Sequence, residues 1–158
     1  MFTIKKSNNS TISYNTCNRE VILIDATDVV VGRLSAYVAQ ILRGKHKPIF
    51  SPNANLGDFV IIINAEKVKF TSNKENTKEY FRHTGFPGGI KSLTPRQLRA
   101  RGKSRDILIK AIEGMLPNGP LGRVVLKNLR VYNGDSHDHA NLKPKIINFQ
   151  ELKRQNIA

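Results

Sequence analysis

Histidines and carboxylates lie close together near the end of the sequence, at Asp135, His137, Asp138 and His139. Both side-chain types bind metal ions, and His137 and His139 would point the same way on an extended segment. A metal site would need at least one distant ligand, for which His83 is the obvious donor. The simpler interpretation is that these histidines hydrogen-bond backbone or phosphate groups in a polar loop. We therefore expect no metal site, and a metal-dependent hydrolase is the competing hypothesis.

Other patterns typical of enzymes are missing from the sequence. Cys17 is the single cysteine, so the chain can form neither an intramolecular disulfide nor a cysteine zinc site, and it has no G-x-S-x-G motif. A nucleotide-binding turn after the first predicted strand would need several glycines. Only Gly32 is found there, and Asp25 and Asp28 would repel a phosphate. We expect no catalytic residue, no cofactor and no small-molecule substrate.

The chain carries a large excess of positive charge. Its 158 residues include 26 Lys and Arg against 12 Asp and Glu, which gives a net charge of +14. Eleven of these cations fall within residues 82–130, where only Asp106 and Glu113 oppose them. A compact domain with this charge repels itself unless it meets a polyanion.

Nucleic acid fits these cations better than a membrane surface does. A helix that lies on a membrane has a cationic face and a face rich in Trp or Phe. This chain has no tryptophan, and glycine and serine interrupt its cations in residues 96–110. No run of about 18 apolar residues is present that could cross a bilayer. Glycines in residues 85–89 and 114–122 would let the backbone approach a phosphodiester chain closely.

The apolar pattern predicts the elements that hold the first cations. Residues 21–24 and 59–63 are apolar on both faces, as in buried parallel strands. Residues 67–70 alternate polar and apolar side chains, as in a half-exposed strand. Between the two buried strands, apolar residues follow the spacing of a helix, at Leu34, Tyr37, Val38, Ile41 and Leu42. Gly44 would end this helix in a left-handed conformation, so residues 45–47 would project beyond it as a basic cluster.

The second half of the chain is predicted to contain one more strand and three short helices. Residues 78–83 suit the strand, Thr94 would cap a helix that reaches about residue 101, and Ser104 would cap the next. The inner face of that second helix is predicted to be Ile107, Leu108, Ala111, Ile112 and Met115. A third helix is expected at about residues 121–129. Short strands that alternate with helices predict a single α/β domain with a mainly parallel sheet. We expect this domain at residues 19–142, a flexible or peripheral arm at 1–18 and a peripheral tail at 143–158.

Several motifs match one known family, in order along the chain. They are Ile24-Asp25-Ala26-Thr27 with Gly32-Arg33-Leu34, Leu42-Arg43-Gly44-Lys45-His46-Lys47, Gly57-Asp58 with Asn64-Ala65-Glu66-Lys67-Val68, His83-Thr84-Gly85 with Gly88-Gly89, Gly114-Met115-Leu116-Pro117-Asn118-Gly119-Pro120-Leu121-Gly122, and Val131-Tyr132-Asn133-Gly134 with His137 and His139. On these residues the chain resembles the bacterial-type family of large-subunit ribosomal protein thirteen. The resemblance implies a three-layer α/β/α domain around a four-stranded, mainly parallel sheet.

The same resemblance implies a non-catalytic role in a bacterial or organellar ribosome. The protein would be a structural constituent of the large subunit in the cytoplasm or organelle, would bind large-subunit ribosomal RNA and neighbouring ribosomal proteins, and would help early subunit assembly. Binding of messenger RNA away from the ribosome would need the same sequence features, and this alternative stays open.

The expected RNA-binding residues are basic side chains and histidines on loops and short helices. They are Arg33, Arg43, Lys45, His46, Lys47, Arg82, His83, Lys91, Arg96, Arg99, Arg101, Lys103, Arg105, Arg123, Lys127, Arg130, His137 and His139. Arginine can contact a phosphate through two hydrogen bonds and can stack on an unpaired base. Recognition would be mainly of RNA shape and backbone, because A-form RNA hides the base edges of its major groove.

Overall fold

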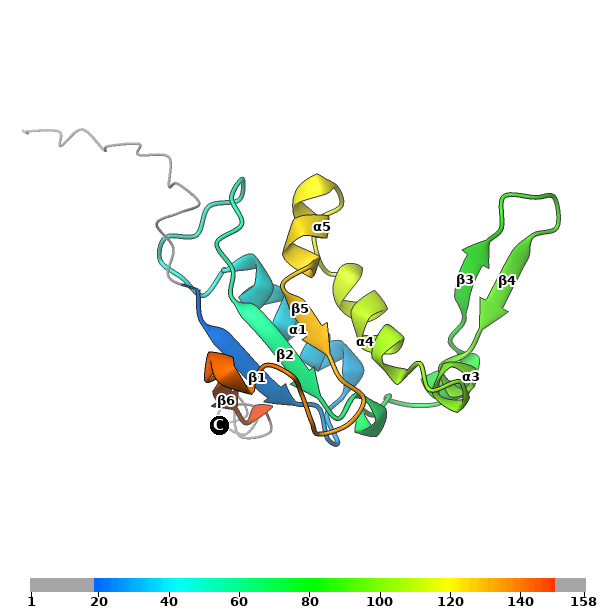
Figure 1. Ribbon diagram of the computed structural model, residues 1–158. Coiled ribbons are helices and arrows are strands. Elements are labelled where there is room, and N and C mark those ends of the chain that lie inside the picture. The colour runs from blue at the N-terminus through cyan, green and yellow to red at the C-terminus, as the bar shows by residue number, and fades with distance from the viewer. Residues whose placement is uncertain (1–18, 150–158) are drawn as a thin grey trace, which may run out of the picture.

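A four-stranded parallel sheet forms the centre of the protein. The computed structural model describes residues 19–149. Its central sheet contains β1 (Val21–Asp25), β2 (Phe59–Ile63), β5 (Leu129–Val131) and β6 (Lys145–Ile147), in the order β5-β2-β1-β6 (Figure 1). All three pairs of neighbouring strands are parallel. The predicted α/β class and four-stranded, mainly parallel sheet are therefore confirmed.

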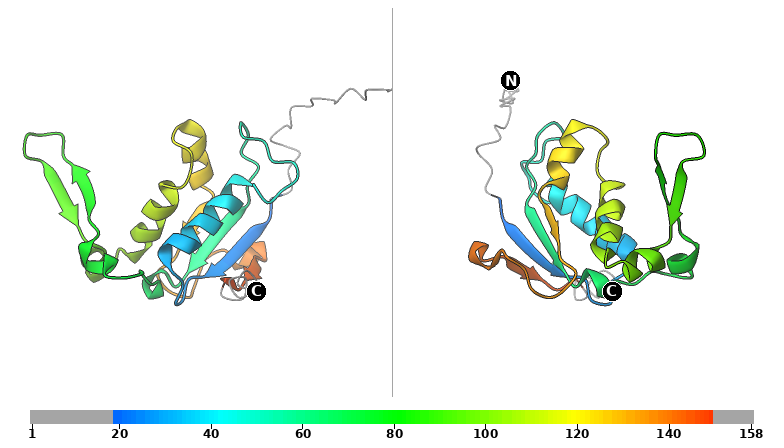
Figure 2. Two further views of the ribbon diagram at one scale, coloured as in Figure 1. Left: turned by 180° about the vertical axis from the view of Figure 1, so that it is seen from behind. Right: turned by 45° about the vertical axis from the view of Figure 1, so that its right-hand side comes forward.

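The two central strands are buried on both faces, as their unbroken apolar sequences predicted. Ile24, Val60 and Ile62 have no exposed surface, and Leu23 and Ile61 point to the opposite face of the sheet and are also buried. Helix α1 (Val31–Arg43) covers one face, together with α4 (Ser104–Glu113) and α5 (Pro120–Leu126). The short helix η3 (Ala140–Leu142) lies on the other face (Figures 1 and 2). The arrangement is consistent with the expected three layers.

Helix α1 is the longest helix of the described residues, and its pattern was predicted correctly. Leu34, Val38 and Leu42 of the apolar stripe have no exposed surface, because this stripe packs on the sheet and on α4. The helix ends at Gly44 in the left-handed conformation, with a φ of 80°, and this confirms the predicted C-cap. No helix within residues 19–149 has the length and apolar character that crossing a membrane requires.

Three elements differ from their predictions. The half-exposed strand expected at residues 67–70 is instead a 3₁₀ helix, η2 (Ala65–Lys67), followed by an isolated bridge between Val30 and Lys69. Ser104 is the first residue of α4 and not its cap, which is Lys103. Part of the expected tail, residues 145–147, forms the edge strand β6 beside β1, while residues 1–18 and 150–158 lie outside the described residues.

An antiparallel hairpin projects away from the sheet and its helices. Strands β3 (Tyr80–His83) and β4 (Ile90–Leu93) form it, and it stands beside α3 (Pro95–Ala100), far from the central sheet (Figure 1). The predicted strand at 78–83 is thereby confirmed, but its partner β4 was not predicted. A four-residue helix, α2 (Lys74–Thr77), leads into β3. The hairpin and α3 extend the α/β domain with a basic arm.

A hydrogen-bond network around Asp25 joins the carboxyl ends of β1 and β2. The Asp25 Oδ1 atom accepts hydrogen bonds from Asn64 Nδ2 at 2.9 Å, from the Thr27 backbone N–H at 3.0 Å and from the Thr27 hydroxyl at 2.7 Å. Partial burial raises the pKa of Asp25, but these hydrogen bonds and the charge of Lys67 outweigh it, so the pKa lies below the ordinary value of 3.8. The network therefore favours the ionised carboxylate.

The lowered pKa of Asp25 predicts a loss of stability in acid. An acid whose pKa is lower in the folded state stabilises the protein above its unfolded pKa, and this contribution disappears as the pH falls through the folded pKa. We expect Asp25→Asn to lower the free energy of unfolding at pH 7, and we expect the difference from wild type to shrink below about pH 4. Urea unfolding from pH 7 to pH 3 measures it; a difference that is constant with pH would contradict the role of the ionised carboxylate.

Gly57 lets the segment before β2 pass close to the end of α1. A Cβ atom at Gly57 would lie 1.7 Å from the Leu42 carbonyl oxygen, which cannot move without disturbing the helix. We expect Gly57→Ala to lower the free energy of unfolding by about 1–3 kcal/mol or more, as overpacked core substitutions do. Gly134→Ala is the matched control because a Cβ atom there would meet no atom within 4 Å. Chemical denaturation measures the stability of both variants, and equal stabilities would contradict this prediction.

Candidate nucleic-acid interface

Like charges face each other across the projecting hairpin. Arg82 and Lys91 are direct partners in the β3–β4 register, and both are exposed. Like charges at directly opposite positions destabilise a sheet. No carboxylate among residues 19–149 forms an ion pair with either side chain. The arrangement is unfavourable in the free protein and becomes favourable when an anion lies along this face of the hairpin.

The other face and the tip of the hairpin expose large apolar side chains. Phe81 is 69% exposed, Phe86 is 74% exposed and Ile90 is 68% exposed. At the tip, the Gly85 backbone N–H donates to His83 Nδ1 at 2.9 Å. This nitrogen therefore acts as an acceptor, so Nε2 of the neutral ring carries the proton and can donate it. Aromatic rings beside cations are typical of surfaces that bind single-stranded or looped RNA.

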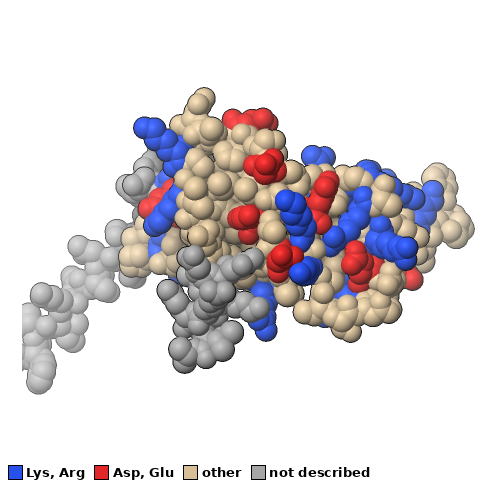
Figure 3. Space-filling view, turned by 90° about the horizontal axis from the view of Figure 1, so that it is seen from below, with Lys and Arg blue, Asp and Glu red and all other residues tan. Residues whose placement is uncertain are grey.

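A second exposed basic group lies on α3 and on the turn to α4. Arg96, Arg101 and Lys103 are exposed, and α3 begins with the predicted cap at Thr94, whose hydroxyl accepts from the Gln97 backbone N–H at 3.4 Å. Lys and Arg gather toward this end of the molecule in the view from below (Figure 3). The expected cations are therefore displayed together here.

Asn133 fixes the turn between α3 and α4, a role that was not predicted from the sequence. Its Nδ2 donates to the Gly102 carbonyl at 3.0 Å, and its Oδ1 accepts from the Arg105 backbone N–H at 3.1 Å. The Arg105 side chain stays 64% exposed and lies 3.7 Å from Asp106. Asn133 was noted only as part of a motif, because the pairing of residues 31 positions apart follows from the fold.

Arg99 differs from its basic neighbours because it binds the protein itself. Its guanidinium donates to the carbonyls of Glu66, at 2.8 Å, and of Val68, and it lies 3.3 Å from the Glu75 carboxylate. These contacts join α3 to η2 and α2. The structure thus gives Arg99 a positioning role, and its guanidinium is largely used by internal partners.

The cluster after α1 is likewise divided between internal and exposed cations. Asp58, whose side chain is only 1% exposed, accepts from the Glu20 backbone N–H at 2.9 Å and pairs with Lys47 and with His46 Nε2, the latter at 2.8 Å. Lys45 is exposed beyond the Gly44 cap. Asp58 holds this loop against β2: Lys47 is largely covered, His46 is 41% exposed although it contacts Asp58, and Lys45 is exposed and forms no ion pair among the described residues.

The remaining predicted residues are spread over three further places. Arg33 of α1 and the pair Arg123 and Lys127 at α5 are exposed. Arg130 is exposed as well, but it donates to the Lys127 carbonyl at 2.7 Å and so holds the end of α5. Arg43 is half-buried, and its guanidinium lies 5.7 Å from the centre of the Phe50 ring.

The two histidines of the candidate metal site pack on one tyrosine. The rings of His137 and His139 lie 6.4 Å and 6.2 Å from the ring of Tyr132. The His139 backbone N–H donates to His137 Nδ1 at 3.2 Å, so this nitrogen has a partner within the loop. Within residues 19–149, no three His, Cys, Asp or Glu side chains come together as a metal site would require. His83 lies on the hairpin and does not join them.

Comparison with known proteins decides the family. A sequence model of the family described as ribosomal protein L13 matches residues 19–138. This chain belongs to the ribosomal protein L13 family. It is 50% identical to the large ribosomal subunit protein uL13 of Anaplasma phagocytophilum over 135 residues, 85% of each chain. It is 52% identical to that of Brucella canis over 135 residues (85% of this chain, 88% of the relative) and 49% identical to that of Neorickettsia sennetsu over 138 residues (87% and 91%).

Membership of the L13 family confirms the resemblance drawn from the motifs. The family is one of structural ribosomal proteins of the large subunit and not of enzymes, so the competing hydrolase hypothesis is rejected. Within the L13-type domain, some of the predicted cations have partners inside the protein and others are exposed without a carboxylate partner among the described residues.

Arg99 and Arg101 are neighbours with different surroundings, and this predicts different effects of substitution. We expect Arg99→Ala to lower the free energy of unfolding by about 1–3 kcal/mol, because two carbonyls and Glu75 lose a charged donor. Arg101→Ala removes an exposed side chain and should change it by less than about 0.5 kcal/mol. Urea denaturation compares the two; equal effects would contradict the internal role of Arg99.

Proposed function

We propose that this chain is a structural constituent of the large ribosomal subunit that binds large-subunit ribosomal RNA through its displayed cations and helps early subunit assembly. The observation that carries the proposal is the pairing of Arg82 with Lys91 on a hairpin held away from the domain. Repulsion between these two cations destabilises the hairpin in the free protein. The phosphates of a polyanion that lies along the hairpin would remove this repulsion.

The cations that we propose as direct phosphate contacts are those exposed at the surface. They are Arg33, Lys45, Arg82, Lys91, Arg96, Arg101, Lys103, Arg105, Arg123 and Lys127. His46, Lys47, Arg99 and Arg130 instead hold the loops that present these side chains. His83, exposed at the hairpin tip, would donate from Nε2, while Arg43, His137 and His139 would contribute at the margins of the surface.

The proposed partners are ribosomal RNA and neighbouring proteins of the large subunit. Relatives named as large ribosomal subunit proteins, all from bacteria, support a place in a bacterial-type ribosome in the cytoplasm. A rigid sheet that fixes basic loops at set distances suits folded RNA, where phosphates from separate helices meet. Such a protein would stabilise a local RNA fold early in assembly and then remain in the subunit.

Removal of the two hairpin cations tests this proposal. We expect Arg82→Gln/Lys91→Gln to fold at least as stably as wild type, because it removes a like-charge pair, and to bind a transcribed fragment of large-subunit ribosomal RNA more weakly. The slope of log K against log salt should fall by roughly 0.7–0.9 for each phosphate that the variant no longer neutralises. Filter binding at several salt concentrations measures the slope, and circular dichroism measures the stability.

The double variant Lys143→Gln/Lys145→Gln is the matched control. It removes the same charge from exposed positions at and beside the edge strand β6. We expect it to bind ribosomal RNA as wild type does. Equal weakening by both double variants would mean that net charge alone drives binding. Preferential binding of messenger RNA fragments, or loss of the wild-type chain from large subunits in a high-salt wash, would contradict a structural role in the ribosome.

A further inference from the structure

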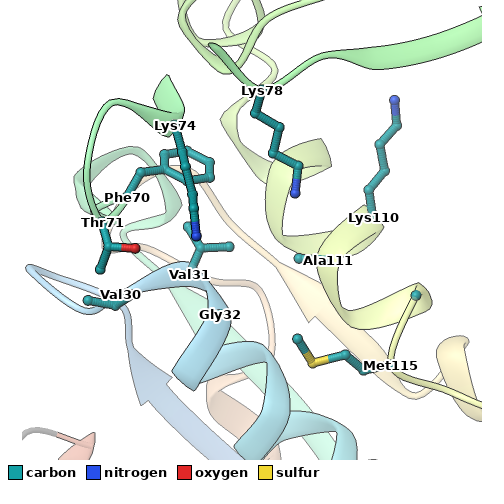
Figure 4. Close-up of a pocket in the computed structure, with 11 residues that line it drawn as sticks. Val30, Val31, Gly32, Phe70, Thr71, Lys74, Lys78, Lys110, Ala111 and Met115 are labelled. Atoms are coloured by element: carbon teal, nitrogen blue, oxygen red, sulfur yellow. The ribbon is translucent and has the colours of Figure 1, made fainter. Parts of the chain in front are cut away.

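Three lysines surround a hollow between the first turn of α1 and the end of α4. The pocket has a volume of about 360 Å³. Lys74 of α2 and Lys78, which precedes β3, extend into the space between the two helices, while Lys110 of α4 stands at the rim toward the hairpin (Figure 4). None of the three was among the predicted RNA-binding residues, because their segments come together only in the fold.

No negative charge compensates these lysines. The pocket is lined by no Asp or Glu, and among residues 19–149 no carboxylate forms an ion pair with Lys74, Lys78 or Lys110. The Nζ atoms of Lys78 and Lys110 both lie close to the Tyr80 ring, at 5.2 Å and 5.0 Å from its centre. Each ammonium group is attracted by the face of this ring, which holds the two lysines beside the pocket without neutralising their charge.

The floor of the pocket is apolar. Val31, Phe70 and Met115 line it, and Met115 is 47% exposed although the sequence pattern placed it on the inner face of its helix. A phosphate ion alone would leave this floor uncovered. The volume lies within the range of about 300–1,000 Å³ that is typical of small-molecule sites. A ligand with an anionic group and a flat apolar part would fill both regions.

Gly32 leaves room for a ligand beside the first turn of α1. It lies in the first turn of α1 and lines the pocket, and a Cβ atom built on it would meet no atom within 4 Å. Neither the backbone conformation nor the packing of this helix therefore requires glycine, which is a poorer helix former than alanine. Close approach of an external group to the helix backbone is a reason for glycine at such a position.

Of the two acidic residues that argued against a phosphate at this turn, one is paired with a lysine, while Asp25 stays ionised within its hydrogen-bond network. Asp28 forms an ion pair with Lys69 at 2.8 Å. Asp25 accepts hydrogen bonds from Thr27 and Asn64 at the opposite side of the β1 end. In the first turn of α1, the Val31 backbone N–H donates to the Lys69 carbonyl at 3.0 Å and that of Leu34 to the Val30 carbonyl at 3.1 Å, so the N–H groups of Gly32 and Arg33 are the ones that could meet an anion.

We propose that this pocket holds one unpaired nucleotide of the bound RNA, with its phosphate at Lys74 and Lys78 and its base against Phe70 and Met115. The inference rests on the proposed function and names a site for it that is distinct from the hairpin. Unpaired bases of RNA are recognised by packing on apolar and aromatic side chains, whereas double-stranded RNA would present no base to this pocket. The apolar floor thus distinguishes a looped or bulged segment from a regular helix.

Gly32→Ala gives the sharpest test, because it should affect folding and binding in opposite directions. We expect its thermal unfolding midpoint to equal or exceed that of wild type, since alanine favours the helix. Its affinity for a transcribed ribosomal RNA fragment should fall by about tenfold or more if a stacked base is displaced. Lys74→Gln/Lys78→Gln should lose a similar factor, and Lys143→Gln/Lys145→Gln serves as the charge-matched control.

The single described methionine provides a direct readout of the pocket. The chain has two methionines, and Met1 lies outside the described residues, so Met115 can be followed by methyl NMR of selectively labelled full-length protein, with Met115→Leu to assign its signal. We expect adenosine 5′-monophosphate and the RNA fragment to shift the Met115 signal through the ring current of the base, and inorganic phosphate alone to leave it unchanged. If inorganic phosphate shifts the Met115 signal as much as the nucleotide does, the base does not lie against Met115, and the proposed site is overturned.

The outcomes separate this inference from the proposed function. If wild type fails to bind the ribosomal RNA fragment, the proposed function itself fails. If wild type binds and either Gly32→Ala or Lys74→Gln/Lys78→Gln binds equally well, the nucleotide site is overturned while the hairpin surface stands. If the variants bind more weakly and the control does not, the site is supported.

Discussion

Repulsion between fixed cations is the constraint on which this structure depends. The whole chain has a net charge of +14, and Lys and Arg gather on the side that bears α3 and the hairpin (Figure 3). The free energy that stabilises the fold comes mainly from the central sheet. Its two middle strands are buried on one face by α1, α4 and α5 and covered on the other by η3. The apolar core is therefore separate in space from the basic arm that α3 and the hairpin form. Packing in the core provides the stability that repulsion between the cations of the arm would otherwise reduce.

Internal hydrogen bonds divide the basic residues into two sets with different roles. Arg99 and Arg130 donate to backbone carbonyls, and Lys47 pairs with the buried Asp58. These cations have partners within the protein and hold their loops in place. Arg82 and Lys91, by contrast, face each other without a carboxylate between them. In the proposed function, cations beside the loops that the first set holds would not have to be ordered when RNA binds, and preorganised groups of this kind bind more tightly.

The sequence predicted the elements whose local pattern and burial agree. The stripe from Leu34 to Leu42 and the apolar runs of β1 and β2 are long enough to identify a helix and two buried strands. The pattern failed at β4, β6 and η2, which are short or half-exposed and are determined by the segments beside them. The cations of the candidate site could be proposed from the sequence, because charge is visible there, and their role in binding stays a prediction. Which cations have internal partners was not predictable, since Glu66 and Asp58 meet Arg99 and Lys47 only after folding.

The same reasoning explains why the lysine pocket was missed and why its chemistry differs from that of the hairpin. Lys74, Lys78 and Lys110 come from three segments, and each alone is an ordinary surface charge. The fold places them above an apolar floor, whereas the hairpin displays its cations on an open strand surface. An open cationic surface attracts any phosphate backbone and so provides affinity without selectivity. A concave site with an apolar floor is filled only where the RNA chain leaves its helix, so the two surfaces together would bind RNA and also set its position on the protein.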